Sequence, residues 1–251
     1  FKSLNIVLYQ KKIRTIVIGY DTRGSHKRIL DLISKNLVSL DRINIINKPI
    51  STPAIQLISK EYKTFGIMIT ASHFCHKYNG FKFFLRGEKI SKKFEKKIIQ
   101  KINKRSNSKI KFITKKVRIK INPYISMINK KFRFKNTHKV LFDCANGSIS
   151  TFYKEINFLS NTKIINTNFK KNKINENCGT NFLKKNLKKT YYKFFEYCLA
   201  FDGDGDRLSV SKKNYGVIET EKLALIYYLY LNKKKNIVGT EITNPWLKEK
   251  L

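Results

Sequence analysis

The sequence predicts an α/β protein made of consecutive α/β domains, with mixed, mostly parallel sheets covered by helices. Short apolar runs typical of strands recur along the chain, and most are followed by stretches with apolar residues three or four positions apart, which is helical spacing. Alternating strands and helices are typical of parallel sheets. With 251 residues, 41% of them hydrophobic, the chain is long enough to bury the cores of two such domains.

The first part of the chain consists of strand, loop and helix in succession. A continuous apolar strand is followed by a polar loop and by a helix with apolar residues at Ile29, Ile33 and Leu37. Thr52 as N-cap and Pro53 at the first helical position predict the start of a second helix. The expected elements are helices at 2–10, 29–38, 52–62 and 91–102, and strands at 15–19, 66–69 and 81–84.

Residues 104–116 are polar, basic and weakly patterned, which predicts a domain boundary. We therefore expect a first domain over residues 1–116, a second over 117–214 and the beginning of a third over 215–251. In these two domains we expect helices at 125–132, after 148, from 182 and, buried, at 222–231, and strands at 140–142, 163–165, 198–201, 208–210 and 237–240.

The formal net charge of +36 raises the possibility of a nucleic-acid partner. The lysines, however, are spread along the whole chain with an excess of Asn and Ile, and no nucleic-acid-binding motif accompanies them. We expect no specific nucleic-acid partner and attribute the charge to A+T-rich codons. Weak, salt-sensitive binding to polyanions is the alternative, and steep loss of DNA retention with salt would reveal it.

No apolar run approaches the length of a membrane span, so no membrane partner is expected. The four cysteines form no CxxC pair, which favours a reducing, cytoplasmic location. The start at Phe1, with no initiator Met or signal pattern, is typical of a fragment. The sequence leaves the oligomeric state open.

Residues 202–206 read Asp-Gly-Asp-Gly-Asp and follow a short apolar run. Asp202, Asp204 and Asp206 repel one another unless a cation is present, and Mg²⁺ prefers oxygen ligands. The glycines allow the tight loop that such a site needs. A calcium EF-hand is excluded because its sixth and twelfth positions would be Arg207 and Lys213 rather than Gly and Glu. Arg207 is suited to bind phosphate oxygens beside the cation.

Ser72 also follows an apolar strand, with His73 beside it and Lys82 ten residues later on the next predicted strand. Each residue alone has an ordinary interpretation as loop serine, structural histidine or solvated lysine. Together with the acidic loop they indicate phosphoryl transfer: Ser72 as phosphate carrier, His73 and Lys82 as groups that move protons and balance charge, and Mg²⁺ to neutralise the phosphoryl oxygens.

Three motifs, in this order and spacing, resemble the α-D-phosphohexomutase family: residues 19–25, residues 70–73 with 79–82, and residues 202–207. The resemblance implies a phosphoserine at Ser72, which binds Mg²⁺ together with Asp202, Asp204 and Asp206. It also implies an acid/base role for Lys82 and contacts of Arg207 and Arg23 with the phosphoserine.

Residues 51–55, 143–147 and 175–179 resemble the bacterial phosphoglucosamine mutase branch of that family. This implies interconversion of glucosamine 6-phosphate and glucosamine 1-phosphate through a bisphosphate intermediate, and hence a role in amino-sugar nucleotide synthesis. We expect the family's sugar-reading and phosphate-clamping loops to lie outside these 251 residues. Phe74 and Cys75 replace the family's Asn-Pro, which favours one alternative, a non-catalytic remnant; phosphomannomutase or phosphoglucomutase activity is another.

Overall fold

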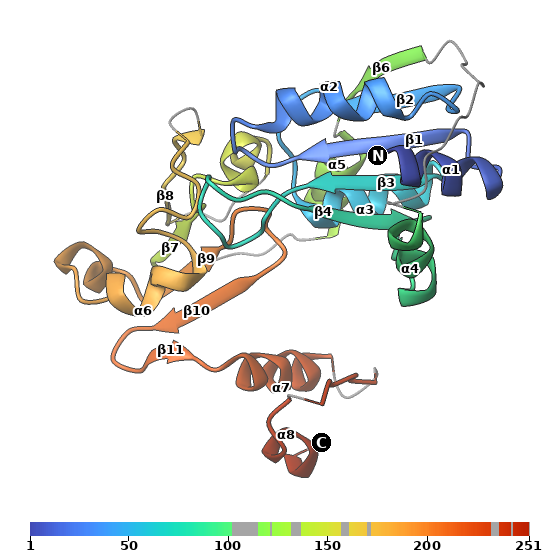
Figure 1. Ribbon diagram of the computed structural model, residues 1–251. Coiled ribbons are helices and arrows are strands. Elements are labelled where there is room, and N and C mark those ends of the chain that lie inside the picture. The colour runs from blue at the N-terminus through green and yellow to red at the C-terminus, as the bar shows by residue number, and fades with distance from the viewer. Residues whose placement is uncertain are drawn as a thin grey trace.

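The computed structural model describes residues 1–101, 115–120, 122–131, 137–156, 161–169, 172–231, 236–241 and 243–250, and Figure 1 shows how their elements are arranged. Two separate sheets, each formed by one part of the chain, organise these residues. The expected α/β fold with mixed sheets is thus confirmed. None of the helices in the described ranges is long and apolar enough to cross a membrane.

The first sheet has the strand order β5-β4-β3-β1-β2-β6. β1 pairs in parallel with β2 and β3, and β2 pairs in parallel with β6, whereas β4 is antiparallel to both β3 and β5. The bounds are β1 Thr15–Tyr20, β2 Arg42–Ile46, β3 Phe65–Ile69, β4 Phe81–Leu85, β5 Glu88–Lys89 and β6 Lys115–Ile119.

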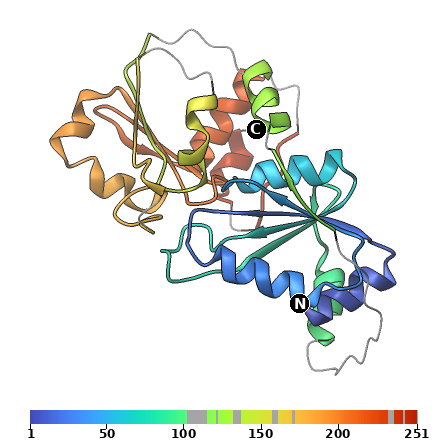
Figure 2. The same ribbon diagram turned by 90° about the horizontal axis from the view of Figure 1, so that it is seen from above.

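Helices cover both faces of this sheet. Successive strand residues point to opposite faces, so Ile16 and Ile18 pack with Leu4 and Ile33 in one core cluster, while Val17 belongs to the other. Figure 2 shows the sheet between α2 (blue) and α3 (cyan). The helices on the first face are α1 (Lys2–Gln10), α2 (His26–Asn36) and α4 (Lys92–Gln100), and those on the second are α3 (Thr52–Glu61) and α5 (Asn122–Lys131).

The second sheet has the strand order β11-β10-β9-β7-β8. β7 pairs in parallel with β8 and β9, and β10 lies antiparallel between β9 and β11. Leu141 and Ala200 of this sheet pack against Leu183 in a smaller core. The bounds are β7 Val140–Asp143, β8 Thr162–Ile165, β9 Tyr197–Phe201, β10 Leu208–Lys212 and β11 Gly216–Ile218.

Two helices predicted in the second domain are not regular α-helices. After residue 148 the chain forms two 3₁₀ turns, η1 (Ser148–Thr151) and η2 (Tyr153–Glu155). The hydroxyls of Ser150 and Thr151 donate to carbonyl oxygens three residues earlier, which competes with α-helical hydrogen bonding. The predicted basic helix from 182 is reduced to α6 (Leu183–Asn186), between the 3₁₀ segments η4 (Thr180–Phe182) and η5 (Thr190–Phe194).

The last part of the chain differs most from expectation. Residues 236–240 have no regular structure, so the strand predicted there is wrong; a strand needs a neighbour, and in the described chain none lies beside it. The helix expected at 222–231 is present as α7 (Thr220–Tyr230), but none of its residues is buried. It contacts α8 (Trp246–Lys250), and Figure 1 shows both apart from the two sheets.

The predicted domain limits stay predictions, because most of the boundary at 104–116 lies outside the described residues. Two pairings near those limits are informative. β6 begins at Lys115 and joins the first sheet, and β11 ends at Ile218 in the second sheet. Sheet membership therefore assigns Lys115–Ile119 to the first unit and Gly216–Ile218 to the second.

Candidate functional site

Three loops from the two sheets meet at the carboxyl ends of β1, β3 and β9. They comprise residues 21–25, 70–80 and 202–207. The Thr70 hydroxyl donates to the Asp21 carboxylate at 2.7 Å and joins the first two loops. This is the sheet end at which α/β proteins commonly bind ligands.

The third loop gathers the three aspartates into one cage. Asp202, Asp204 and Asp206 each offer a carboxylate oxygen, and these oxygens lie within 4.8 Å of one another. The backbone amides of Asp206 and Arg207 both donate to Asp202 Oδ1 at 3.1 Å, so the loop is wrapped around that carboxylate. Gly205 has a φ of +67°, which a residue with a Cβ adopts only at a cost.

The cage fits a hard cation. Asp204 Oδ1 is buried and has no hydrogen-bond partner among the described residues, although buried carboxylate oxygens are normally paired. Burial, with the neighbouring charge of Asp204, raises the pKa of Asp202 to about 6. Both observations indicate negative charge that the protein does not compensate fully. Clustered carboxylate oxygens are ligands that suit Mg²⁺.

Ser72 lies at this cage, as the sequence motifs predicted. Its hydroxyl donates to Asp202 Oδ2 at 2.6 Å, across 130 residues of sequence. Ser72 has a φ of +49°, unusual for a residue with a side chain, and its amide donates to Thr70 Oγ1 at 2.8 Å. The strained backbone thus directs the serine oxygen to the aspartates.

Lys82 comes to the cage from β4. Its ammonium lies 2.6 Å from Asp204 Oδ2 and 2.5 Å from Asp206 Oδ2. Burial by itself lowers the pKa of Lys82, but the two carboxylates outweigh it and the net direction is upward. Lys82 is therefore charged in this arrangement, and it neutralises part of the cage.

His73 and Arg207 flank the site. His73 is half-buried and packs against Phe74, with 4.4 Å between ring centroids and 32° between ring planes. Burial, with the nearby charge of Arg207, lowers the pKa of His73. Its Nδ1 is buried without a hydrogen-bond partner in the described chain. Arg207 is exposed, and within the described residues its guanidinium makes no ion pair, so it is available to an anion.

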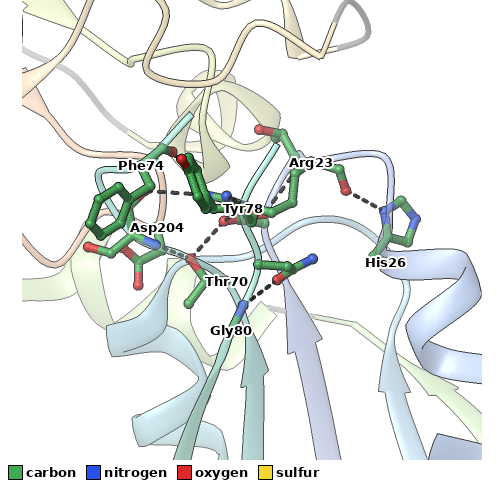
Figure 3. A network of polar contacts seen from close by, with 12 residues as sticks. Arg23, His26, Thr70, Phe74, Tyr78, Gly80 and Asp204 are labelled. Carbon is green, nitrogen blue, oxygen red and sulfur yellow. Dashed lines mark hydrogen bonds and ion pairs between the residues drawn. The ribbon is translucent and has the colours of Figure 1, made fainter. Parts of the chain in front are cut away.

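Arg23 binds the loop that carries Ser72, residues 70–80 (the serine loop), through main-chain oxygens. The side chain is fully buried, and its Nε lies 2.8 Å from an Asp21 carboxylate oxygen. Its terminal nitrogens donate to carbonyl oxygens of the serine loop, and Figure 3 shows Arg23 next to Thr70, Phe74 and Tyr78. The accepting carbonyls belong to Ser72 (3.3 Å), Phe74 (3.4 Å), Cys75 (3.0 Å) and Tyr78 (2.5 Å). Arg23 thus lies beside Ser72 but binds the backbone of its loop, and its expected contact with a phosphate on Ser72 stays a prediction.

Two contributors to the site were not predicted. The Thr52 amide donates to the Asp204 carbonyl oxygen at 2.8 Å, and its hydroxyl donates to Asp204 Oδ2. Thr52 is the first residue of α3 and Ser51 is its N-cap, so the helix begins one position earlier than expected. The second is Asn175, which bonds the serine loop. Both residues lie in motifs, residues 51–55 and 175–179, whose family resemblance predicted no contact with the site.

Comparisons with known proteins agree with this geometry. Residues 3–109 match the family model described as "Phosphoglucomutase/phosphomannomutase, alpha/beta/alpha domain I". Among solved structures, a phosphoglucomutase/phosphomannomutase family protein from Burkholderia thailandensis superposes with a TM-score of 0.71 and 20% identity, over 99% of this chain and 60% of that one. The phosphoglucomutase parafusin from Paramecium superposes with a TM-score of 0.68 and 17% identity, over 90% and 51%. At these identities the two structures establish the fold.

The chain is similar to members of the phosphohexomutase superfamily. Within it, the sequence is similar to phosphoglucosamine mutases: 31% identical to that of Buchnera aphidicola subsp. Baizongia pistaciae, over 96% of this chain and 56% of that protein. It is 34% identical to that of Prochlorococcus marinus strain AS9601, over 93% and 55%. The chain thus spans just over half the length of the curated relatives it matches.

Proposed function

We propose that this chain is the phosphoserine- and metal-bearing part of a phosphoglucosamine mutase, which interconverts glucosamine 6-phosphate and glucosamine 1-phosphate. The observation that carries the proposal is the 2.6 Å hydrogen bond from the Ser72 hydroxyl to Asp202, one of three clustered carboxylates, which is the arrangement that a phosphate carrier beside a metal site would need. The similarity to phosphoglucosamine mutases supports this choice of sugar. A cytoplasmic location and a role in amino-sugar nucleotide synthesis form part of the same proposal.

Asp202, Asp204 and Asp206 would hold a Mg²⁺ ion together with the phosphate on Ser72. The unpartnered Asp204 Oδ1 supports this assignment. When bound, the ion supplies neutralisation of the phosphoryl oxygens. The Arg207 guanidinium would bind those oxygens from the exposed side.

In the proposed reaction the phosphoryl group moves from Ser72 Oγ to the free hydroxyl of the sugar phosphate. The bond from phosphorus to the serine oxygen breaks and a bond to the sugar oxygen forms. The sugar hydroxyl loses a proton and Ser72 Oγ gains one. Lys82, charged in the cage, would donate its proton to Ser72 Oγ and then take up the proton of the sugar hydroxyl. His73, beside Ser72, is a second candidate for proton movement. The bisphosphate formed then turns round and returns its other phosphate to Ser72.

The proposal is tested by incubating the complete gene product with glucosamine 6-phosphate, Mg²⁺ and a catalytic amount of the bisphosphate. We expect glucosamine 1-phosphate to appear by ³¹P NMR, and Ser72→Ala to abolish its formation. A protein that is phosphorylated on Ser72 but converts no glucosamine phosphate contradicts the proposal. Conversion of mannose 6-phosphate instead would identify a phosphomannomutase, and conversion of glucose 6-phosphate would identify a phosphoglucomutase.

The alternative of a non-catalytic remnant is supported by Phe74, the residue second after Ser72. Its side chain is 53% exposed, and it stands where the family resemblance predicts Asn. The same experiment decides it. A remnant would bind Mg²⁺ or phosphosugar and convert none of the three sugars.

A further inference from the structure

The second sheet carries two loops, residues 143–147 and 174–179, to which the proposed chemistry assigns no role. The buried carboxylate of Asp143 joins them. Its Oδ1 accepts from the Ala145 amide at 2.9 Å, and its Oδ2 accepts from the Gly179 amide at 2.9 Å. Since Asp143 is only 1% exposed, these bonds fix both loops to the end of β7.

From this base, Asn175 reaches the serine loop. The backbone amide of Asn175 donates to the Ala145 carbonyl oxygen at 2.9 Å, and the φ of Asn175 is +59°. The side-chain Nδ2 donates to the carbonyl oxygens of Ser72 at 2.8 Å and Phe74 at 2.9 Å. These are two of the carbonyls to which Arg23 also donates, at 3.3 and 3.4 Å. The serine loop is therefore bound from both sheets.

The aspartate loop, residues 202–207, packs closely against the side-chain amide of Asn175. A Cβ built on Gly203 would lie 2.7 Å from Asn175 Nδ2 and 2.8 Å from the Ser72 carbonyl oxygen. The amide, Gly203 and the Ser72 backbone therefore lie in direct contact. A small displacement of Asn175 would alter both the backbone of Ser72 and the loop that carries Asp202.

We propose that Asn175 is a positioning residue, which holds Ser72 in its left-handed conformation with the hydroxyl directed at Asp202. Its two donated hydrogen bonds fix the carbonyl groups on either side of His73, and Asp143 fixes the loop that presents it. The kinetic consequence rests on the proposed function; the structural consequence does not.

The test compares Asn175→Gly and Asn175→Asp with Asn177→Gly. Glycine keeps the left-handed backbone but removes the amide, and aspartate keeps the shape but removes the donor. Asn177 is a matched control in the same loop, with a φ of +55° and an exposed side chain. Circular dichroism and thermal unfolding first establish that the variants are folded. If Asn175→Gly does not fold, Asn175→Asp decides.

Both Asn175 variants should exchange the amide hydrogens of residues 71–78 faster than wild type. They should lose about 10–100-fold in Mg²⁺ affinity and in kcat, with KM little changed, as is usual when a supporting hydrogen bond is removed. Asn177→Gly should match wild type in all three. Wild-type exchange and Mg²⁺ affinity in both Asn175 variants would overturn the inference. If wild type has no mutase activity, the proposed function fails, whereas exchange and metal affinity still decide the role of Asn175.

Discussion

At the scale of single residues, Asp202 is a carboxyl group whose surroundings disfavour its ionised form. Burial, with the charge of Asp204, raises its pKa to about 6. Between its ordinary pKa and this value the folded protein binds more protons than the unfolded one, so the stability of the metal-free protein falls as pH rises through this window. Above about pH 6 the cost of the ionised Asp202 is complete.

Asp202→Asn removes that cost, since the amide oxygen can still accept from Asp206 and Arg207. In EDTA we expect the variant to be more stable than wild type by about 1–3 kcal/mol at pH 7.5, with the difference shrinking towards pH 4. Urea unfolding across this range measures it. Asp31→Asn, at an exposed position of α2, is the control and should show no such trend. A difference that does not depend on pH contradicts the assignment.

Excess Mg²⁺ should reverse this order, because a ligand that binds only the folded protein stabilises it and the variant has lost a binding carboxylate. The same unfolding curves, repeated in Mg²⁺, check this. If Mg²⁺ raises the midpoints of both proteins equally, Asp202 is not a ligand.

At the scale of elements, the aspartate loop between β9 and β10 depends on close backbone contacts. At Gly203, an added Cβ would lie 2.6 Å from Ile174 Cδ1 as well as against Asn175 and the Ser72 carbonyl oxygen. The obstacle at Ser72 is backbone and cannot rotate away. We expect Gly203→Ala to cost about 1–3 kcal/mol of stability and to weaken Mg²⁺ binding.

Urea unfolding and calorimetric titration with Mg²⁺ test Gly203→Ala. Gly239→Ala is the matched control, because the atoms nearest to a Cβ there belong to the side chain of Thr243, at 3.2 Å or more, and Gly239 is exposed. Wild-type stability and affinity in Gly203→Ala would show that the loop has more freedom than these contacts indicate.

The elements also show what the sequence could predict. β1 and β3 are continuous apolar runs buried on both faces, so pattern alone located them within one residue. β2, with the sequence Arg-Ile-Asn-Ile-Ile, was not predicted, because a short apolar run without turn signals is ambiguous. The 3₁₀ turns after 148 depend on hydroxyl hydrogen bonds that no periodicity encodes.

The residues of the site also divide into those that the sequence could predict and those that it could not. Ser72, Lys82 and the aspartates were predictable because their residue types have few other uses in such a cluster. The role of Asn175 was not, because an asparagine that donates to carbonyl groups 101 and 103 residues away has no local sequence signal. Likewise, only the structure shows that Arg23 is fully buried and directed at main-chain oxygens.

At the scale of the whole molecule, the site lies where loops from the two sheets meet. Besides the contacts of Asn175, the Thr22 hydroxyl donates to the Asn146 carbonyl at 2.7 Å and the Gly24 amide to Asn172 Oδ1 at 3.0 Å. Ser72 and Lys82 come from the first unit and the three aspartates from the second. The cage is therefore held together by groups from both units, with Lys82 of the first unit paired with Asp204 and Asp206 of the second.

If the proposed function is right, the cage and the phosphate on Ser72 bind the metal ion together, and Mg²⁺ affinity should depend on whether Ser72 is phosphorylated. Phosphorylation adds about 1.5–2 negative charges at an oxygen that now lies 2.6 Å from Asp202. Without a cation that charge repels the carboxylates, and with one it completes the ligand set. We expect Mg²⁺ to bind the Ser72-phosphorylated protein at least about tenfold more tightly than the unphosphorylated protein. Isothermal titration of the two forms, with Ser72→Ala behaving as the unphosphorylated one, measures this, and equal affinities would contradict a metal shared between the two units.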